Sequence, residues 1–128
     1  IDNAMVGFLD TLNLPSKLDD PIRYALLAPG KRIRPLLAWA SAQAAGGSGN
    51  ESVPVAVAVE LIHAFSLVHD DLPALDNDDL RRGRPTLHKH AGEAAAILAG
   101  DAMLALAFEA LSTVKPIPST TVHSTLIA

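Results

Sequence analysis

The sequence predicts an all-α fold in a single domain, and three observations indicate it. The 128 residues include 22 alanines but only 4% aromatic residues, a composition that favours packed helices over a sheet. Proline and glycine break the chain into segments of helical length, with no internal repeat and no linker between two units. The length suits one domain with a modest core.

The composition also excludes several classes of protein. No cysteine is present, so a disulfide framework, a thiolate nucleophile and a Cys-ligated zinc site are excluded. A net charge of −4 argues against a nucleic-acid partner. No uncharged apolar run reaches the roughly 18 residues of a membrane span. We expect a cytoplasmic protein, with a removed targeting segment left open because the chain begins at Ile1 rather than Met.

Residues 2–14 form the first expected helix, because their apolar side chains recur along one stripe. The stripe consists of Met5, Phe8, Leu9 and Leu12. Pro15 breaks this helix. The Asp20-Pro21 pair then predicts the N-cap and first position of a short helix that ends near Leu27.

The following helices are bounded by further proline and glycine signals. Pro29-Gly30 predicts a turn, after which Pro35 opens a helix that Gly46-Gly47 closes. Ser52 is the expected N-cap of a long helix, with Pro54 in its first turn. That helix is expected to run to about Asp71.

The rest of the chain divides into a loop, a helix and a tail. Residues 72–89 mix acids, bases, Pro and Gly, and predict an ordered loop with at most one helical turn. Residues 93–111 predict a second long helix, in which we expect Asp101 to be buried. Residues 112–128 are rich in Pro, Ser and Thr, and we assign them no structure.

The strongest functional signal is acidic and lies at the end of the helix over 52–71. Asp70, Asp71 and Asp76 add carboxylates where the helix dipole is already negative, a conflict that a bound cation removes. Mg²⁺ is typically held by one or two carboxylates plus substrate phosphates, and the arginines that follow suit phosphate oxygens. A solvated, self-neutralising loop is the alternative, whereas an EF-hand fits poorly because its loop glycine is missing.

A second signal is the basic segment over residues 30–35. Lys31 and Arg34 share a face if the turn is helical, and Arg32 excludes a Walker A loop because it occupies the Ser/Thr position. A solvated helix start is the alternative. His63 lies on the same helix face as Asp70, where it can donate to a phosphate or pack as an ordinary core histidine.

Three motifs follow one another in the chain. They are Gly-Lys-Arg-x-Arg-Pro, then Glu-x-Ile-His-x-x-Ser-Leu-x-His-Asp-Asp-Leu-Pro-x-x-Asp-x-Asp-x-x-Arg-Arg-Gly, then Leu-Ala-Gly-Asp-Ala. In this order they resemble the N-terminal half of the trans-isoprenyl diphosphate synthases, or polyprenyl synthetases. The resemblance runs from about Tyr24 to Leu111. It implies the N-terminal helices of an all-α isoprenoid-synthase bundle, usually a homodimer.

The resemblance also implies a role for individual residues. The first aspartate motif, which holds Mg²⁺ on the allylic diphosphate, would consist of Asp70, Asp71 and Asp76. Arg81 would contact that same diphosphate. Isopentenyl diphosphate would be held by Lys31, Arg34, His63 and Arg82. Asp78 and Asp79 are interpreted as structural acids.

Product length is expected to depend on Phe65 and Ser66, which lie about 6–7 Å before Asp70 along the helix axis. An aromatic residue there resembles the bacterial farnesyl diphosphate synthases. A geranylgeranyl diphosphate synthase is the alternative, and so is a Phe65 that only packs against a neighbouring helix.

The implied activity is the Mg²⁺-assisted ionisation of an allylic diphosphate and its condensation with isopentenyl diphosphate. Members of the family are longer and carry a second aspartate motif, which nothing after Leu111 resembles. We therefore expect these 128 residues to be inactive alone. Pro29 also departs from the glycine usual there. Two alternatives stay open: a non-catalytic regulatory subunit and a helical Mg²⁺-binding module. The retained set of cations favours the enzyme.

Overall fold

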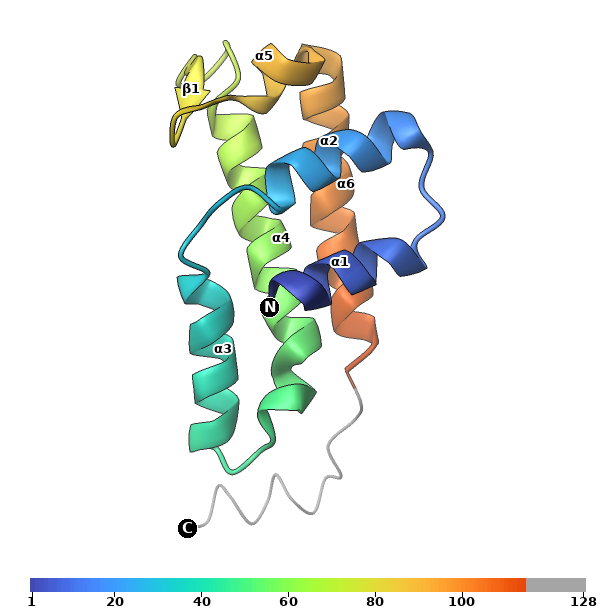
Figure 1. Cartoon of the computed structure of the whole chain (residues 1–128), viewed down its shortest axis with the longest axis vertical. Coiled ribbons are helices and arrows are strands. Elements are labelled where there is room, and N and C mark those ends of the chain that lie inside the picture. Colours follow the sequence, from blue (N-terminus) through green and yellow to red (C-terminus); the bar gives the residue numbers. More distant parts are fainter. Residues whose placement is uncertain (115–128) are drawn as a thin grey trace.

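The computed structural model describes residues 1–114, which form a bundle around two long antiparallel helices (Figure 1). The helices, with η1 a 3₁₀ turn, are α1 (Asp2–Thr11), α2 (Ser16–Leu26), α3 (Ile33–Ala44), η1 (Gly49–Ser52), α4 (Val53–Asp70), α5 (Leu87–Ala91) and α6 (Glu93–Ser112). A two-residue hairpin pairs β1 (Leu80–Arg81) with β2 (Arg84–Pro85). The all-α prediction is therefore confirmed.

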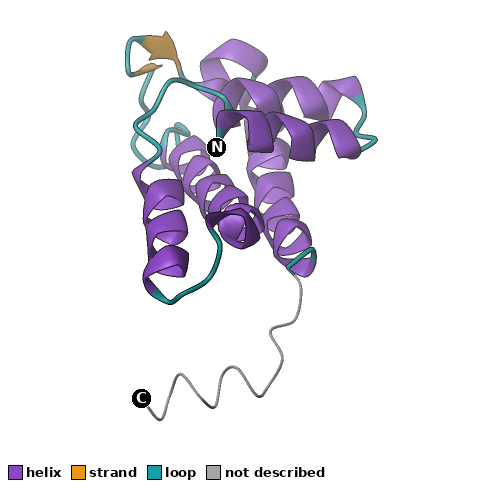
Figure 2. Ribbon diagram, turned by 60° about the horizontal axis from the view of Figure 1, so that its bottom comes forward, coloured by secondary structure: helices purple, strands orange, loops and turns teal. Residues whose placement is uncertain are grey.

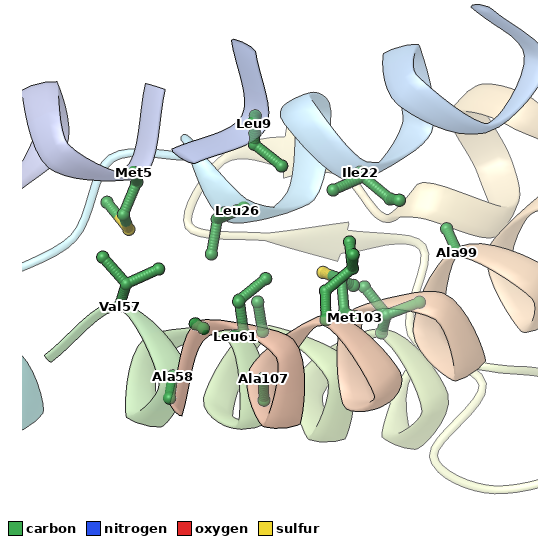
Figure 3. Packing of buried hydrophobic residues seen from close by; sticks show 14 of the residues in the cluster. Met5, Leu9, Ile22, Leu26, Val57, Ala58, Leu61, Ala99, Met103 and Ala107 are labelled. Carbon is green, nitrogen blue, oxygen red and sulfur yellow. The ribbon is translucent and has the colours of Figure 1, made fainter. Parts of the chain in front are cut away.

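The core lies where α1 and α2 cross the pair formed by α4 and α6 (Figure 3). Met5, Leu9 and Ile22 come from the first two helices and are fully buried against Leu61 and Met103. Buried alanines line the contact between the two long helices. They are Ala58, Ala64, Ala96, Ala99, Ala107 and Ala110.

Helix α2 corrects one sequence expectation, because it begins at Ser16 and contains Pro21 within it. The carbonyl of Pro15 accepts hydrogen bonds from the amides at 18 and 19, so the first turn forms before the Asp20-Pro21 pair. The ion pair between Asp19 and Arg23, at 2.8 Å, and the burial of the apolar face stabilise the helix across the proline.

The other boundaries lie close to prediction. Helix α1 ends at Thr11 and helix α3 begins at Ile33 rather than Pro35. Ser52 takes the expected N-cap position of α4, but its hydroxyl donates to the Gly49 carbonyl at 2.7 Å and makes no capping bond. The loop expected over 72–89 contains the hairpin as well as part of α5, and both lie at the end of the bundle where α4 finishes (Figure 2).

Asp101 was expected to be buried, and that prediction is wrong. Its side chain is 66% exposed at the edge of the contact between the two long helices, where Oδ1 lies 3.9 Å from Nε2 of His69 on α4. The prediction of no structure for 112–128 is tested only up to residue 114. Helix α6 extends to Ser112, one residue into that range. The rest of the range lies outside the described residues.

Two helical segments, Gly49–Asp70 and Glu93–Ser112, are long and apolar enough to cross a membrane by length and composition alone. Both supply the buried side chains of the core, and core helices of water-soluble proteins pass the same test.

Candidate functional site: a cationic pocket beside an aspartate-rich helix end

The loop before α3 turns sharply at Arg32, whose backbone is left-handed with φ of 49°. For a residue with a Cβ this conformation costs about 1 kcal/mol. The side chain donates from Nε to Asp2 Oδ1 at 2.7 Å, from Nη1 to Glu60 Oε1 at 3.0 Å, and from Nη2 to the Ala28 carbonyl at 3.0 Å. Burial lowers the pKa of Arg32, but bonds to Asp2 and Glu60 more than offset this, so the pKa is raised.

One pocket collects the four residues that the family resemblance assigns to isopentenyl diphosphate. Its walls come from the loop before α3 and the first turn of α3, from α4 and from the hairpin. They are formed by Pro29, Gly30, Lys31, Arg32, Ile33, Arg34, Glu60, His63 and Arg82. Within residues 1–114, no acidic side chain forms an ion pair with Lys31, Arg34 or Arg82, so these three cations are available to an anion.

The hairpin brings Arg82 to this pocket. Arg82 and Gly83 both have positive φ, 52° and 77°, which is the type I′ geometry of a two-residue turn. Arg82 Nη1 donates to the Pro29 carbonyl at 2.8 Å and so spans from the hairpin to the loop before α3. A Cβ at Gly30 would lie 2.7 Å from the same Nη1, so glycine permits this approach.

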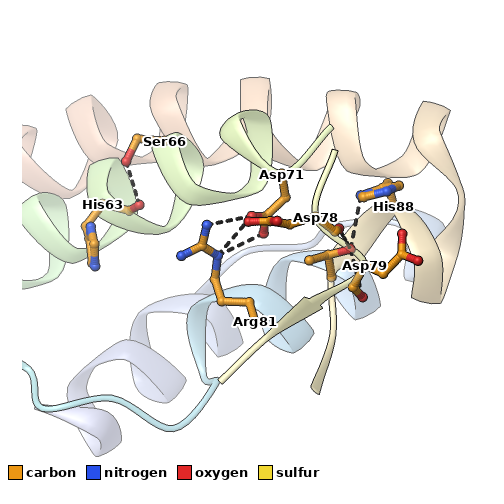
Figure 4. A network of polar contacts seen from close by, with 8 residues as sticks. His63, Ser66, Asp71, Asp78, Asp79, Arg81 and His88 are labelled. Atoms are coloured by element: carbon orange, nitrogen blue, oxygen red, sulfur yellow. Dashed lines mark hydrogen bonds and ion pairs between the residues drawn. The ribbon is translucent and has the colours of Figure 1, made fainter. Parts of the chain in front are cut away.

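The aspartates at the end of α4 differ in their surroundings, and Figure 4 shows Asp71 facing Arg81. Asp71 is 3% exposed and both its oxygens accept hydrogen bonds from Arg81, with Nε at 3.0 and 2.9 Å. This bond to Asp71 raises the pKa of Arg81. Asp70 and Asp76 are exposed, and the Asp76 amide donates to the Asp70 carbonyl at 2.8 Å, which folds the loop back on the helix end.

No group of three metal-ligating side chains comes together in the part of the chain that the structure describes. The chemistry of the donors nevertheless fits a Mg²⁺ site. Asp70 and Asp76 are exposed carboxylates whose backbones are joined by a hydrogen bond, and Mg²⁺ needs only one or two carboxylates when phosphate oxygens complete its shell. Asp71 is less accessible than these two, because it is 3% exposed and accepts three hydrogen bonds from Arg81, so it can join them once that side chain shifts.

His63 is kept neutral by its surroundings. Burial lowers its pKa from the ordinary 6.5, and Arg34, Arg82 and Arg81 lower it further, against a smaller opposing effect of Glu60. At pH 7 the imidazole can therefore donate a hydrogen bond without carrying charge.

Two residues before the aspartates were expected to control product length, and both are half-buried on α4. The ring of Phe65 packs edge-on against His69, with 5.0 Å between centroids, and it also contacts the core. Ser66 Oγ donates to the His63 carbonyl at 2.9 Å. Asp79, interpreted as structural, forms an ion pair with Lys89 at 2.9 Å. Thr86 Oγ1 donates to the Asp78 carbonyl at 2.7 Å.

Arg32 and Glu60 were not predicted as members of the site. Glu60 carried a usable signal, since a single acid in the apolar part of a long helix requires a buried partner. Arg32 carried none, because a basic segment does not reveal which of its side chains turns inward.

The helical bundle has the fold of the isoprenoid synthases, the class to which similar solved structures belong. Geranyltransferase from Legionella pneumophila superimposes with a TM-score of 0.85 at 41% identity, over 97% of this chain and 45% of that chain. An FPP/GFPP synthase from Zymomonas mobilis gives 0.84 at 42% identity, over 95% and 45%.

The chain belongs to the polyprenyl synthetase family, whose model matches residues 15–127. This match extends beyond 24–111, the range that carried the resemblance. Geranylgeranyl pyrophosphate synthase 7 of Arabidopsis thaliana, named as chloroplastic, is 54% identical over 87% of this chain and 33% of its own length. Farnesyl diphosphate synthase of Geobacillus stearothermophilus is 49% identical over 89% and 38%. The chain thus spans about a third of the length of these relatives.

Proposed function

We propose that this chain carries the diphosphate-binding part of a short-chain trans-prenyltransferase, which condenses isopentenyl diphosphate with an allylic diphosphate. The observation that carries the proposal is the pocket itself. Lys31 and Arg34 from one segment and Arg82 from the hairpin border one space, which the neutral His63 also lines. Three uncompensated cations and one neutral donor match the charge and oxygens of a diphosphate.

In this proposal the two diphosphates occupy neighbouring positions. The isopentenyl diphosphate lies among Lys31, Arg34 and Arg82 and accepts a hydrogen bond from His63. The allylic diphosphate lies beside Arg81, with Mg²⁺ on Asp70 and Asp76, and on Asp71 once Arg81 releases it. Mg²⁺, when bound, neutralises the charge that develops on the leaving group.

The reaction then needs no protein nucleophile. The allylic C–O bond breaks and its electron pair leaves with the diphosphate, whose charge Arg81 stabilises. The double bond of isopentenyl diphosphate attacks the allylic cation and extends it by five carbons. A proton is then lost to the released diphosphate, which restores a double bond. The apolar side chains of the bundle exclude water from the cation.

We propose farnesyl diphosphate as the product, because the half-buried ring of Phe65 lies about 7 Å before Asp70 along α4. The relatives do not choose between products, since both farnesyl and geranylgeranyl diphosphate synthases are among them. A geranylgeranyl product and a non-catalytic regulatory subunit stay as alternatives. The expected homodimer and cytoplasmic location stay predictions.

The test measures binding and turnover separately. Inorganic pyrophosphate, titrated without Mg²⁺ in a calorimeter, should bind the chain, and Lys31→Ala should weaken binding about tenfold, a loss of about 1.4 kcal/mol. Lys17→Ala removes an exposed lysine on α2 and should leave the affinity unchanged. Equal affinity in the wild type and Lys31→Ala contradicts the pocket.

Turnover is assayed with Mg²⁺, labelled isopentenyl diphosphate and a series of allylic primers. We expect little or none from these 128 residues, because their sequence carries the first aspartate motif and nothing after Leu111 resembles the second. Robust turnover would show that they suffice for the reaction and would contradict this part of the proposal. Failure to bind either diphosphate would favour the regulatory subunit.

A further inference from the structure

A buried ion pair forms part of the wall of the cationic pocket and has no role in the reaction proposed above. The side chains of Arg32 and Glu60 are 13% and 7% exposed, and Nη1 lies 3.0 Å from Oε1. We propose that Arg32 and Glu60 are positioning residues that hold Lys31 and Arg34 against the diphosphate pocket. This inference rests on the proposed function, since it concerns the same pocket.

The backbone at Arg32 needs a restraint. Its φ of 49° is uncommon for any residue with a Cβ, and such a conformation persists only where surrounding contacts fix it. The three bonds of its guanidinium, to Asp2, Glu60 and the Ala28 carbonyl, supply that restraint. Without them Arg32 can return to a commoner conformation, and the chain on either side of it, which carries Lys31 and Arg34, turns with it.

Glu60 joins the loop to the helix that forms the opposite wall. It lies one turn before His63 on α4, and both residues line the pocket. The ion pair therefore ties the segment that carries Lys31 and Arg34 to the helix that carries the imidazole of His63. Asp2 also binds Arg32, but its side chain is 68% exposed, so solvent and salt weaken that contact.

The test uses inorganic pyrophosphate as the probe, titrated without Mg²⁺ into the whole chain carrying Glu60→Gln. This substitution removes a negative charge beside three cations, so electrostatics alone predicts tighter binding. Positioning predicts the opposite, and we expect binding about tenfold weaker. Asp10→Asn removes the same charge at an exposed site that pairs with Arg23 outside the pocket, and it should leave the affinity unchanged.

Arg32→Lys is the second variant, because it keeps the positive charge but loses the planar fork that reaches three acceptors. It should also weaken pyrophosphate binding, and the double variant should be no weaker than either single one, since both break the same pair. All titrations are made at a temperature where circular dichroism shows each variant folded.

The outcomes separate this inference from the proposed function. Unchanged or tighter binding by both Glu60→Gln and Arg32→Lys, together with loss of binding by Lys31→Ala, overturns the positioning role and leaves the pocket intact. Absence of pyrophosphate binding by the wild type overturns the pocket and this inference together.

Discussion

Gly100 is where the two long helices leave no room for a side chain, so Gly100→Ala tests their packing directly. A Cβ at this position would lie 2.1 Å from Nε2 and 2.4 Å from Cδ2 of the His69 ring. The ring is held in place by an edge-on contact with Phe65 and by a 3.2 Å hydrogen bond between its Nε2 and the Ile97 carbonyl. The added methyl must therefore displace His69 or separate α4 from α6.

The size of the effect follows from two opposing contributions. Overpacking costs about 1–3 kcal/mol, while replacing a glycine by alanine inside a helix stabilises by about 1 kcal/mol. The net cost of Gly100→Ala is then about 0–2 kcal/mol, and we expect it to lower the free energy of unfolding by about 1 kcal/mol. Urea unfolding followed by circular dichroism measures it.

The same substitution made in a His69→Ala variant tests the reasoning, because its effect on stability should then change sign. In His69→Ala the ring is gone, so the methyl of Gly100→Ala meets no obstacle and only the helix preference remains. There the same substitution should stabilise the protein by up to about 1 kcal/mol. If Gly100→Ala changes stability equally in both backgrounds, His69 does not fill this space and the described packing of α4 on α6 is wrong. Gly7→Ala, with nothing within 4 Å of its added Cβ, is the matched control and should stabilise in either background.

Three further predictions concern the site. Phe65→Ala, made in a longer chain that is active, should shift the products toward longer chains in a thin-layer assay. An unchanged product profile contradicts the role of Phe65 in setting product length. Protonation of His63 should destabilise the fold: its pKa is lowered from 6.5, so the unfolded chain binds more protons and the free energy of unfolding falls as pH drops below about 6.5. Unfolding curves at several pH values check this, and His63→Gln should flatten that part of the profile. Asp71→Asn should cost about 2–4 kcal/mol in urea unfolding, because it leaves Arg81 without its buried partner. Asp70→Asn, at an exposed site, should cost less than about 0.5 kcal/mol, and equal costs contradict the burial difference.

The sequence predicts the long helices well because their signals are local. Pro54 in the first turn of α4 and the apolar composition of α4 and α6 are signals that depend only on neighbouring residues, and both helices lie where they were expected. The start of α2 was missed because Pro21 is tolerated inside a helix whose apolar face is buried, which is a tertiary effect. Asp101 was placed inside because an alanine-rich helix does not show which of its faces contacts the core.

The site was predicted as a set of residues and not as an arrangement. The basic segment and the hairpin each contain several cations, and their spacing does not distinguish those that are neutralised internally from those that face a ligand. The structure makes this division: Arg32 and Arg81 are paired with the buried acids Glu60 and Asp71. The hairpin turn, which gives the adjacent Arg81 and Arg82 different partners, needs positive φ at Arg82 and Gly83. Only the glycine gave a local signal of this requirement.

This division of charge lets the pocket combine several clustered cations with a loop that is held in place. Clustered cations repel one another, so a loop that carries several of them tends to open unless something holds it. Here two arginines are neutralised by buried carboxylates and tie the loop and the hairpin to α4. Lys31, Arg34 and Arg82 then keep their charge at positions those ties fix. The buried acids thus neutralise Arg32 and Arg81 and lower the repulsion within the site, while the three cations that line the pocket form no ion pair within residues 1–114.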